Sequence, residues 1–468
     1  MSFARLWATL AILLPALAAM IANLSSVDLA YHLRAGGDIL AGGGIPRTDT
    51  WTFTASGQPW LDQQWGAQVV LAAVYELAGW TGLVLLRAAL VGLLFGLVFL
   101  ACRLRGADIR RAAGLALAAF IVSAVALGLR PQLFGMVLLA STLAVLAMRR
   151  DRPRAMWALP VIVAVWANLH GSFFLGPVVV GLAWLEDRAD RDPGARQTLA
   201  VAVVAVFASL LNPFGPGVWL YAAGLTTNPE VTARISEWQP TTLRTVPGML
   251  FFASAFAVVV LLARRGARTS WPTLAWLGVF FVIGVYAIRG VAWWPLGAAF
   301  AVAPLIARPE PAERPLRAWQ RRFHAAIVGA IVVAGIMLLP VWRPTDPDLG
   351  APAGVVGNAP PGITAALREH ARAGDHLFNP QPWGSWFEFS FPGLPVGIDS
   401  RIEVFPPDVW DDYEHVTSGV DGWQQILERW GVTLIVVPAG DDAFHERLTK
   451  AGWSELSADG DGSLLRAP

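Results

Sequence analysis

Long apolar stretches recur along most of this 468-residue chain, and they constrain its fold more than any other feature. A helix needs about 20 apolar residues to cross the hydrocarbon core of a bilayer. Charged residues make up 15% of the chain, against about 25% in soluble domains. We therefore predict a polytopic α-helical membrane protein with eleven spans. The predicted spans are residues 6–24, 80–101, 113–129, 132–148, 156–170, 172–185, 198–211, 248–263, 270–288, 291–307 and 324–341.

The arginine residues predict which ends of these helices face the cytoplasm. Five arginine-rich loops alternate with arginine-poor loops, and with eleven spans all five fall on the same side as Arg5. Basic residues are enriched in cytoplasmic loops. We therefore predict a multi-pass protein of a bacterial inner membrane, with a cytoplasmic amino terminus. Residues 25–79, 212–247 and the part after residue 342 are predicted to be extracytoplasmic. A cleaved signal peptide is the alternative for the first span.

Two segments depart from the pattern of simple spans. Residues 66–78 are apolar but short and contain Glu76, so we predict an interfacial helix, with a re-entrant or spanning segment as alternatives. After a Pro-rich linker at residues 342–360, helices and buried strands alternate through residues 361–468, which predicts a small α/β domain. Residues 1–341 then form the transmembrane module. The predicted strands are 375–379, 394–399 and 432–438, and the predicted helices are 361–373, 422–431 and 442–452.

Asp28 follows the first predicted span by only a few residues, in the stretch "LSSVDLAYHLRAGGDIL". A hydrated carboxylate at this depth can act as a general base towards a hydroxyl held at the lipid headgroup level. The alternative is a helix amino-terminal cap, because "SSVD" precedes a short amphipathic segment. His32 lies one turn later and shares a helix face with Asp28.

Polar and aromatic side chains gather on the predicted outer face, where we expect them to bind substrate. Tryptophan rings stack on the apolar faces of sugars, although an interfacial aromatic belt is an equally good explanation for Trp60 and Trp65. Asn168 and His170 lie at the outer turn between the fifth and sixth spans. The residues predicted to contact substrate are His32, Arg34, Asp49, Trp60, Asp62, Gln64, Trp65, Asn168 and His170.

Two arginines stand at outer turns, against the general distribution of charge. Arg130 lies between the third and fourth spans, and Arg289 lies between the ninth and tenth. A guanidinium group binds phosphate in a fork geometry. We therefore predict that both bind a lipid phosphate, with a phospholipid contact or a salt bridge to an outer carboxylate as alternatives. Arg87 falls within the second predicted span, where an intramembrane charge is a functional candidate.

The segment "HLRAGGDILAGGGIPRTDTWTFTASGQPWLDQQW" resembles the first outer loop of bacterial GT-C-type membrane glycosyltransferases. Further matches to a poorly characterised group of these enzymes are "LRPQLF", "ANLHGSFFLG", "LLNPFG", "NPQPWGSWFEF" and "GIDSRIEVF". The resemblance spans nearly the whole chain. It implies a GT-C-like fold, a polyprenyl-phosphate-linked sugar as donor, and an acidic catalytic base in this loop, which is Asp28 here. The group often carries an acid where this chain has Gln64, which leaves a second catalytic or metal-binding acid in doubt.

These observations predict an inverting glycosyltransferase that acts on an extracytoplasmic acceptor. Asp28 would deprotonate the acceptor, while the two arginines would stabilise the departing phosphate. No cofactor is indicated, a divalent metal stays open, and no nucleic-acid partner is expected. The alternatives are a non-catalytic lipid or glycan transporter and an oligosaccharide polymerase or ligase. The residues that would contact a glycan acceptor, with a structural role equally open, are Trp383, Asp399, Arg401 and Glu403.

Overall fold

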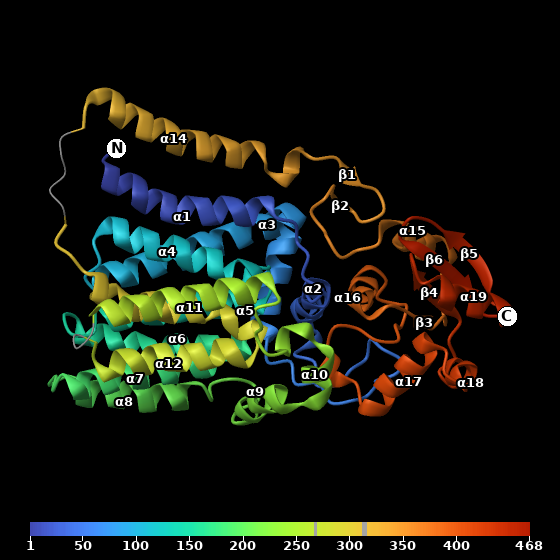
Figure 1. Cartoon of the computed structure of the whole chain (residues 1–468). Coiled ribbons are helices and arrows are strands. Elements are labelled where there is room, and N and C mark those ends of the chain that lie inside the picture. The colour runs from blue at the N-terminus through green and yellow to red at the C-terminus, as the bar shows by residue number, and fades with distance from the viewer. Residues whose placement is uncertain (266–268, 311–315) are drawn as a thin grey trace. The chain divides into compact units, whose positions relative to one another are not determined.

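The computed structural model describes residues 1–265, 269–310 and 316–468 of the chain, and these residues form two compact units (Figure 1). The first unit contains Met1–Ala22 and Val84–Trp342. The second unit contains Asn23–Leu83 and Arg343–Pro468. The segment after the first helix therefore packs with the carboxy-terminal part of the chain. The domain boundaries at residues 341 and 360 stay a prediction.

The first unit is built of helices that run side by side (Figure 1). Within it α1 packs against α4 and α14, while α6, α7 and α8 pack together. Every predicted span coincides with a helix, although some boundaries shift by several residues. The helices that lie wholly in this unit are α1 (Phe3–Ile21), α4 (Ile109–Ser123), α5 (Pro131–Ala147), α6 (Ala158–Leu169), α7 (Leu175–Ala189), α8 (Ala195–Ala208), α9 (Gly217–Thr227), α10 (Pro229–Arg234), α11 (Val246–Arg265), α12 (Trp271–Tyr286), α13 (Trp294–Val302) and α14 (Ala318–Met337).

Length and composition allow five helical segments in the described residues to cross a membrane. They are Phe3–Ile21, Trp65–Leu104, Ile109–Ala126, Val246–Arg265 and Ile288–Ile306. Four shorter apolar helical segments, each of 10 to 17 residues, accompany them. Membrane crossing at all eleven predicted positions therefore stays a prediction, whereas helix formation at those positions is confirmed.

Helix α3 (Trp65–Leu104) contains a break at Gly79, where φ is 56° and ψ is −152°. A positive φ is available to glycine at little cost because it has no Cβ. The break separates residues 66–78 from residues 80–101, the two helices expected from the sequence. Beyond it, Arg87 is buried and donates a hydrogen bond to the carbonyl of Ala22, just after α1. Arg87 thus satisfies an orphan carbonyl at a helix end.

The second unit contains a four-stranded sheet in the order β3-β4-β6-β5. Strand β4 pairs parallel with β3 and antiparallel with β6. The side chains of its buried residues Leu434–Val437 point alternately to the two faces of the sheet. A cluster of apolar side chains from α17, α18 and α19 covers one of these faces. The strands and helices are β1 (Thr345–Asp346), β2 (Ala351–Pro352), α15 (Pro361–His370), β3 (Leu377–Phe378), α16 (Gln381–Ser390), α17 (Pro407–Ser418), α18 (Trp423–Arg429), β4 (Leu434–Pro438), α19 (Asp442–Lys450), β5 (Ser454–Ala458) and β6 (Gly462–Arg466).

The predicted strand at residues 394–399 is wrong in extent. Only Val396 forms ladder contacts there, as isolated parallel bridges to Leu377 and to Thr52. Through Val396 the early segment around Thr52 is joined to the edge of the sheet. A single residue pairs on both sides because Pro395 lacks an N–H and interrupts the ladder.

Candidate functional site

Asp28 stands at the N-cap position of α2 (Leu29–Asp38), but its side chain makes no capping hydrogen bond to the helix. Asp28 is half-buried. The close packing of α2 on the start of α3 fixes this helix, because a Cβ on Gly36 would lie 2.1 Å from the carbonyl oxygen of Gln68. Asp28 therefore occupies the N-cap position that the sequence predicted, but its side chain does not make the hydrogen bond that defines a cap. Its role as a base stays a prediction.

A buried polar chain extends from His32 on the same helix. The side-chain amide of Gln68 lies 3.3 Å from Nδ1 of His32 and donates at 2.7 Å to Oδ1 of Asp62. Because the amide nitrogen can only donate, Nδ1 accepts and the imidazole proton lies on Nε2. His32 and Asp62, both predicted to contact substrate, are 1% and 3% exposed. In this structure they hold α2 against the start of α3.

Burial raises the pKa of Asp62 to about 7, although the hydrogen bond from Gln68 and the charge of Arg401 act in the opposite direction. When the pKa of an acid is higher in the folded state than in the unfolded state, its protonation stabilises the fold. This stabilisation is lost as the pH rises from the unfolded-state pKa to the folded-state pKa. The contribution of Asp62 to the free energy of unfolding should therefore decrease from about pH 4 to about pH 7.

Replacement of Asp62 with asparagine should flatten this pH dependence, because asparagine remains neutral throughout. The measurement is urea-dependent pulse proteolysis of the second unit in the full-length, detergent-solubilised protein at several pH values. Asp38→Asn, an exposed change on the same segment, serves as the control. A stability profile that is equally steep in the Asp62 variant would show that this carboxyl ionises normally.

Arg401 lies at the centre of a buried charge cluster in the second unit. Its guanidinium pairs with both Asp399 and Asp49, with 2.7 Å between Nη2 and Oδ1 of Asp49. Its Cζ lies 4.5 Å and 4.4 Å from the ring centroids of Trp51 and Trp60. The arginine thereby connects the Asn23–Leu83 segment to the carboxy-terminal part. The structure thus brings together four of the predicted binding residues, and all four are buried: Asp49, Trp60, Asp399 and Arg401.

The cluster is balanced in charge if Glu388 is protonated. Burial, supported by the negative charge of Asp399, raises the pKa of Glu388 well above its ordinary value. Arg34 completes the cluster by donating to the carbonyl oxygen of Glu388 at 3.0 Å and by stacking on Trp51. Arg401 makes the ion pairs with Asp49 and Asp399, and the nearby charge of Arg34 balances the second carboxylate. Buried charges require such pairing, which gives these side chains a structural role, while acceptor contact by them stays a prediction.

The remaining predicted residues of the second unit lie nearer its surface. Gln64 and Trp65 are half-buried at the start of α3, where the Gln64 carbonyl accepts hydrogen bonds from the amides of Ala67 and Gln68. Trp383 is half-buried on α16 and packs edge-on against Phe387. Glu403 is half-buried. All four residues therefore keep some of the exposure that a contact with substrate needs.

In the first unit, Arg130 and Arg289 both approach Glu237. Nη2 of Arg130 lies 2.9 Å from Oε1 of Glu237, and Nε of Arg289 lies 3.9 Å from Oε2. Arg289 also lies over Trp238, with 5.7 Å between Cζ and the ring centroid. Burial would raise the pKa of Glu237, but the two arginines outweigh it and lower that pKa. Two positive charges share one carboxylate, so the trio carries a net positive charge.

Asn168 and His170 have local partners in the same unit. The Asn168 amide donates to the carbonyl oxygens of Ala164 at 2.8 Å and Leu211 at 2.9 Å. Nδ1 of His170 lies 2.7 Å from Oγ of Ser172, which also accepts from the indole of Trp166. These contacts fix the turns at which the two residues lie. No structural observation assigns either of them to a substrate.

Sequence reasoning missed Glu388 and Trp51. A lone acid inside the apolar stretch "GSWFEFSF" was a usable signal, because buried acids are rare unless they are paired. Among the described residues, no group of three or more His, Cys, Asp or Glu side chains is placed to hold a metal ion.

The structure is similar to several solved glycosyltransferases. The oligosaccharyltransferase of Archaeoglobus fulgidus, tethered to an acceptor peptide, superposes with a TM-score of 0.60 at 14% identity, over 92% of this chain and 69% of that one. The same archaeal enzyme, AglB, bound to an inhibitory peptide and a dolichol-phosphate, gives 0.60 at 13% identity, over 93% and 70%. The mycobacterial arabinofuranosyltransferase AftD gives 0.57 at 17% identity, over 98% of this chain and 38% of that one.

Both solved proteins are GT-C glycosyltransferases, and this chain has their fold. The chain is a multi-pass membrane protein with a small sheet-containing part near its carboxy terminus. No family model matches the sequence, and no curated protein matches it significantly. At these identities the similarity establishes the fold, and it confirms the GT-C resemblance stated from the sequence.

Proposed function

We propose that the protein is an inverting glycosyltransferase that moves a sugar from a polyprenyl-phosphate carrier to an extracytoplasmic acceptor. The observation that carries this proposal is the trio of Arg130, Arg289 and Glu237 in a chain with the GT-C fold. Its net positive charge suits a departing lipid phosphate, and the carboxylate holds the guanidinium groups in place. The dolichol-phosphate and the acceptor peptide seen with the archaeal enzyme agree with a lipid-linked donor and a separate acceptor.

In the proposed reaction, Asp28 accepts the proton of the acceptor hydroxyl as its oxygen attacks the anomeric carbon. The bond from that carbon to the phosphate oxygen breaks, and the lipid phosphate leaves with the electron pair. A phosphate needs no proton in order to leave, so a single base is sufficient and the anomeric configuration inverts. Guanidinium groups stabilise charge where it develops, which lowers the barrier by several kcal/mol.

The test begins with mass spectrometry of surface glycans from cells with and without the gene. We expect one glycan to lose a sugar when the gene is absent. The purified full-length protein is then supplied with that sugar on polyprenyl phosphate and with the truncated glycan, and the anomeric configuration of the product is read by NMR. Transfer from a nucleotide sugar in the absence of lipid carrier, or a product of retained configuration, would overturn the proposal.

Replacement of Arg289 or Arg130 with glutamine should lower kcat roughly 100-fold, because each removes a charge that stabilises the leaving group. Lysine at either position should restore only part of the rate, since it lacks the fork geometry. Arg244→Gln is the matched control and should leave kcat unchanged, because Arg244 is an exposed arginine of residues 212–247, the segment that carries Glu237. Equal rates for all these variants would remove the arginines from the mechanism.

A further inference from the structure

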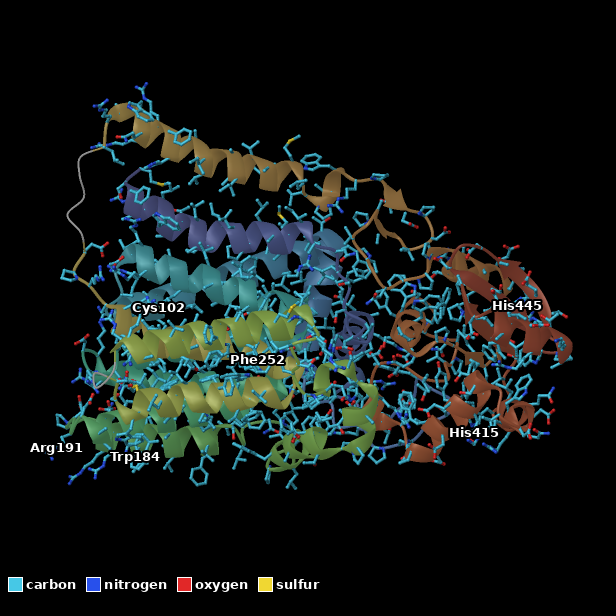
Figure 2. The ribbon with its side chains drawn as sticks, viewed as in Figure 1. Cys102, Trp184, Arg191, Phe252, His415 and His445 are labelled. Carbon is cyan, nitrogen blue, oxygen red and sulfur yellow. The ribbon has the colours of Figure 1, made fainter. Side chains whose placement is uncertain are left out.

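A cavity of about 570 Å³ lies in the first unit, at the end of the helices where α5 finishes. This end carries Arg191, labelled in Figure 2 just beyond α7. Arg130 precedes α5 and Arg149 follows it, so 17 residues of helix separate the cavity from the Arg130 trio. A helix of that length spans roughly 25 Å. The cavity is therefore distinct from the site of proposed transfer, and the arginine distribution predicts that it faces the cytoplasm.

Both signs of charge line this cavity. Arg105 contacts it with Nη1 held 2.7 Å from Oε1 of Glu186, and its Cζ lies 4.7 Å from the ring centroid of Phe300. Nε of Arg105 is buried without a hydrogen-bond partner in the described part of the chain. Oε2 of Glu186 is also buried and lies 3.1 Å from Nη2 of Arg149, so this carboxylate is shared by two arginines. The cavity wall thus combines arginine donors with the carboxylates of Glu186 and Asp151.

Other carboxylates fix the neighbouring arginines. Nε of Arg149 donates to both oxygens of Asp187, at 3.0 Å and 3.2 Å. Arg150 pairs with Asp187, Asp190 and Asp192 at 3.3, 2.6 and 3.3 Å. Because Asp187 is buried and cannot move into solvent, Arg149 is held at the cavity wall. The charged groups are therefore organised before any ligand arrives.

Hydroxyl and apolar groups complete the cavity. Ser270 is the N-cap of α12, and its hydroxyl lies 3.0 Å from that of Thr273 within the first turn of the helix. Hydroxyls and amides at a helix amino terminus favour a phosphate. Leu104, Pro304 and Leu305 form an apolar part of the lining. The lining therefore combines arginine and hydroxyl donors, carboxylates and an apolar wall.

We propose that this cavity binds a phosphoethanolamine headgroup. The phosphate would lie against Arg105 and the Ser270–Thr273 hydroxyls, while the primary ammonium donates to Glu186 and Asp151. A purely anionic group could contact the arginines of the lining but offers no cation to Asp151, and it is a poorer fit for that reason. A quaternary ammonium is also poorer because it has no N–H to donate. The ligand is therefore a zwitterion with a primary amine, as a membrane lipid or as the free headgroup.

The test measures binding to the purified full-length protein in detergent by native mass spectrometry and thermal unfolding. Phosphatidylethanolamine, phosphatidylcholine and phosphatidylglycerol are added separately, and soluble O-phosphoethanolamine forms a further arm. We expect phosphatidylethanolamine to bind about tenfold more tightly than phosphatidylcholine, the equivalent of one charge-assisted hydrogen bond. Tight binding of O-phosphoethanolamine alone would identify a soluble ligand, whereas its weak binding identifies the lipid.

Two variants and one control connect the preference to the cavity. Glu186→Gln should remove the preference for the primary amine. Ser270→Ala combined with Thr273→Val should weaken binding of phosphatidylethanolamine and phosphatidylcholine alike, and these two hydroxyls are paired with each other outside the buried ion network, so folding should be retained. Arg103→Gln is the control. It breaks the ion pair between Arg103, in the last turn of α3, and Glu310, and it should leave the binding of all three lipids unchanged. Equal binding of the three lipids, or an unchanged preference in Glu186→Gln, would overturn the proposal.

Discussion

Asp28→Asn should lower the rate of sugar transfer by roughly 100- to 10,000-fold, the range by which general bases accelerate reactions. Asparagine has nearly the same shape but cannot accept the proton of the acceptor hydroxyl. Binding of the lipid donor should persist, because that contact is assigned to the arginines. The measurement is kcat together with the binding of polyprenyl phosphate to the full-length protein.

Asp38 offers a matched control for this variant, since it ends the same helix and is exposed. Asp38→Asn should keep the full rate. If Asp28→Asn also keeps it, the base lies elsewhere and the transporter or the polymerase becomes the better description. A lost rate accompanied by lost folding, seen as an altered proteolysis pattern, would instead make Asp28 a structural residue.

Arg401→Met should destabilise the second unit by about 3 to 5 kcal/mol. Methionine fills a similar volume, so the loss comes from leaving the carboxylates of Asp49 and Asp399 buried without their cation. The negative charges of Asp399 and Asp49 also raise the pKa of Arg401, because together they outweigh the desolvation of its guanidinium. Urea-dependent pulse proteolysis of the full-length protein measures the change.

Two further variants separate charge from packing in this cluster. Glu388→Gln should be well tolerated, because burial raises the pKa of this carboxyl well above its ordinary value and so favours its neutral form. Arg429→Met removes an exposed arginine paired with Asp412 and should cost at most about 1 kcal/mol. A large loss in Glu388→Gln would show that this acid is ionised, and a small loss in Arg401→Met would show that the cluster contributes little.

Much of the helical architecture followed from apolar periodicity. The break at Gly79 and the boundaries of α5 and α19 lie within a few residues of the prediction. The hairpin of β5 and β6 was missed, although "SADGDGS" between two strands is a strong turn signal. Pairing between Thr52 and Val396 could not be predicted, because it joins segments far apart in the chain whose association depends on tertiary packing.

The candidate site was harder to predict for a similar reason. The sequence marked Asp49 and Arg401 as polar groups of interest, but it carried no sign that they pair with each other and are removed from solvent. Burial is decided by neighbours that arrive from elsewhere in the chain. The same reasoning singled out Arg130 and Arg289, because a charge at an unfavourable predicted topological position is visible without knowing its partner. The structure places both beside Glu237, which is the salt-bridge alternative named from the sequence.

The composition of the second unit has a consequence for biogenesis. Residues Asn23–Leu83 leave the ribosome early, but their packing partners begin only at Arg343. Roughly 260 residues must be translated in between, which takes tens of seconds at ordinary rates of synthesis. During that interval the aspartate destined for Arg401 lacks its cation, and the tryptophans beside it lack the guanidinium that packs on their rings. Truncated or stalled chains should therefore expose this segment to quality-control proteases, and a nascent-chain protection assay should show resistance only after the last residues emerge.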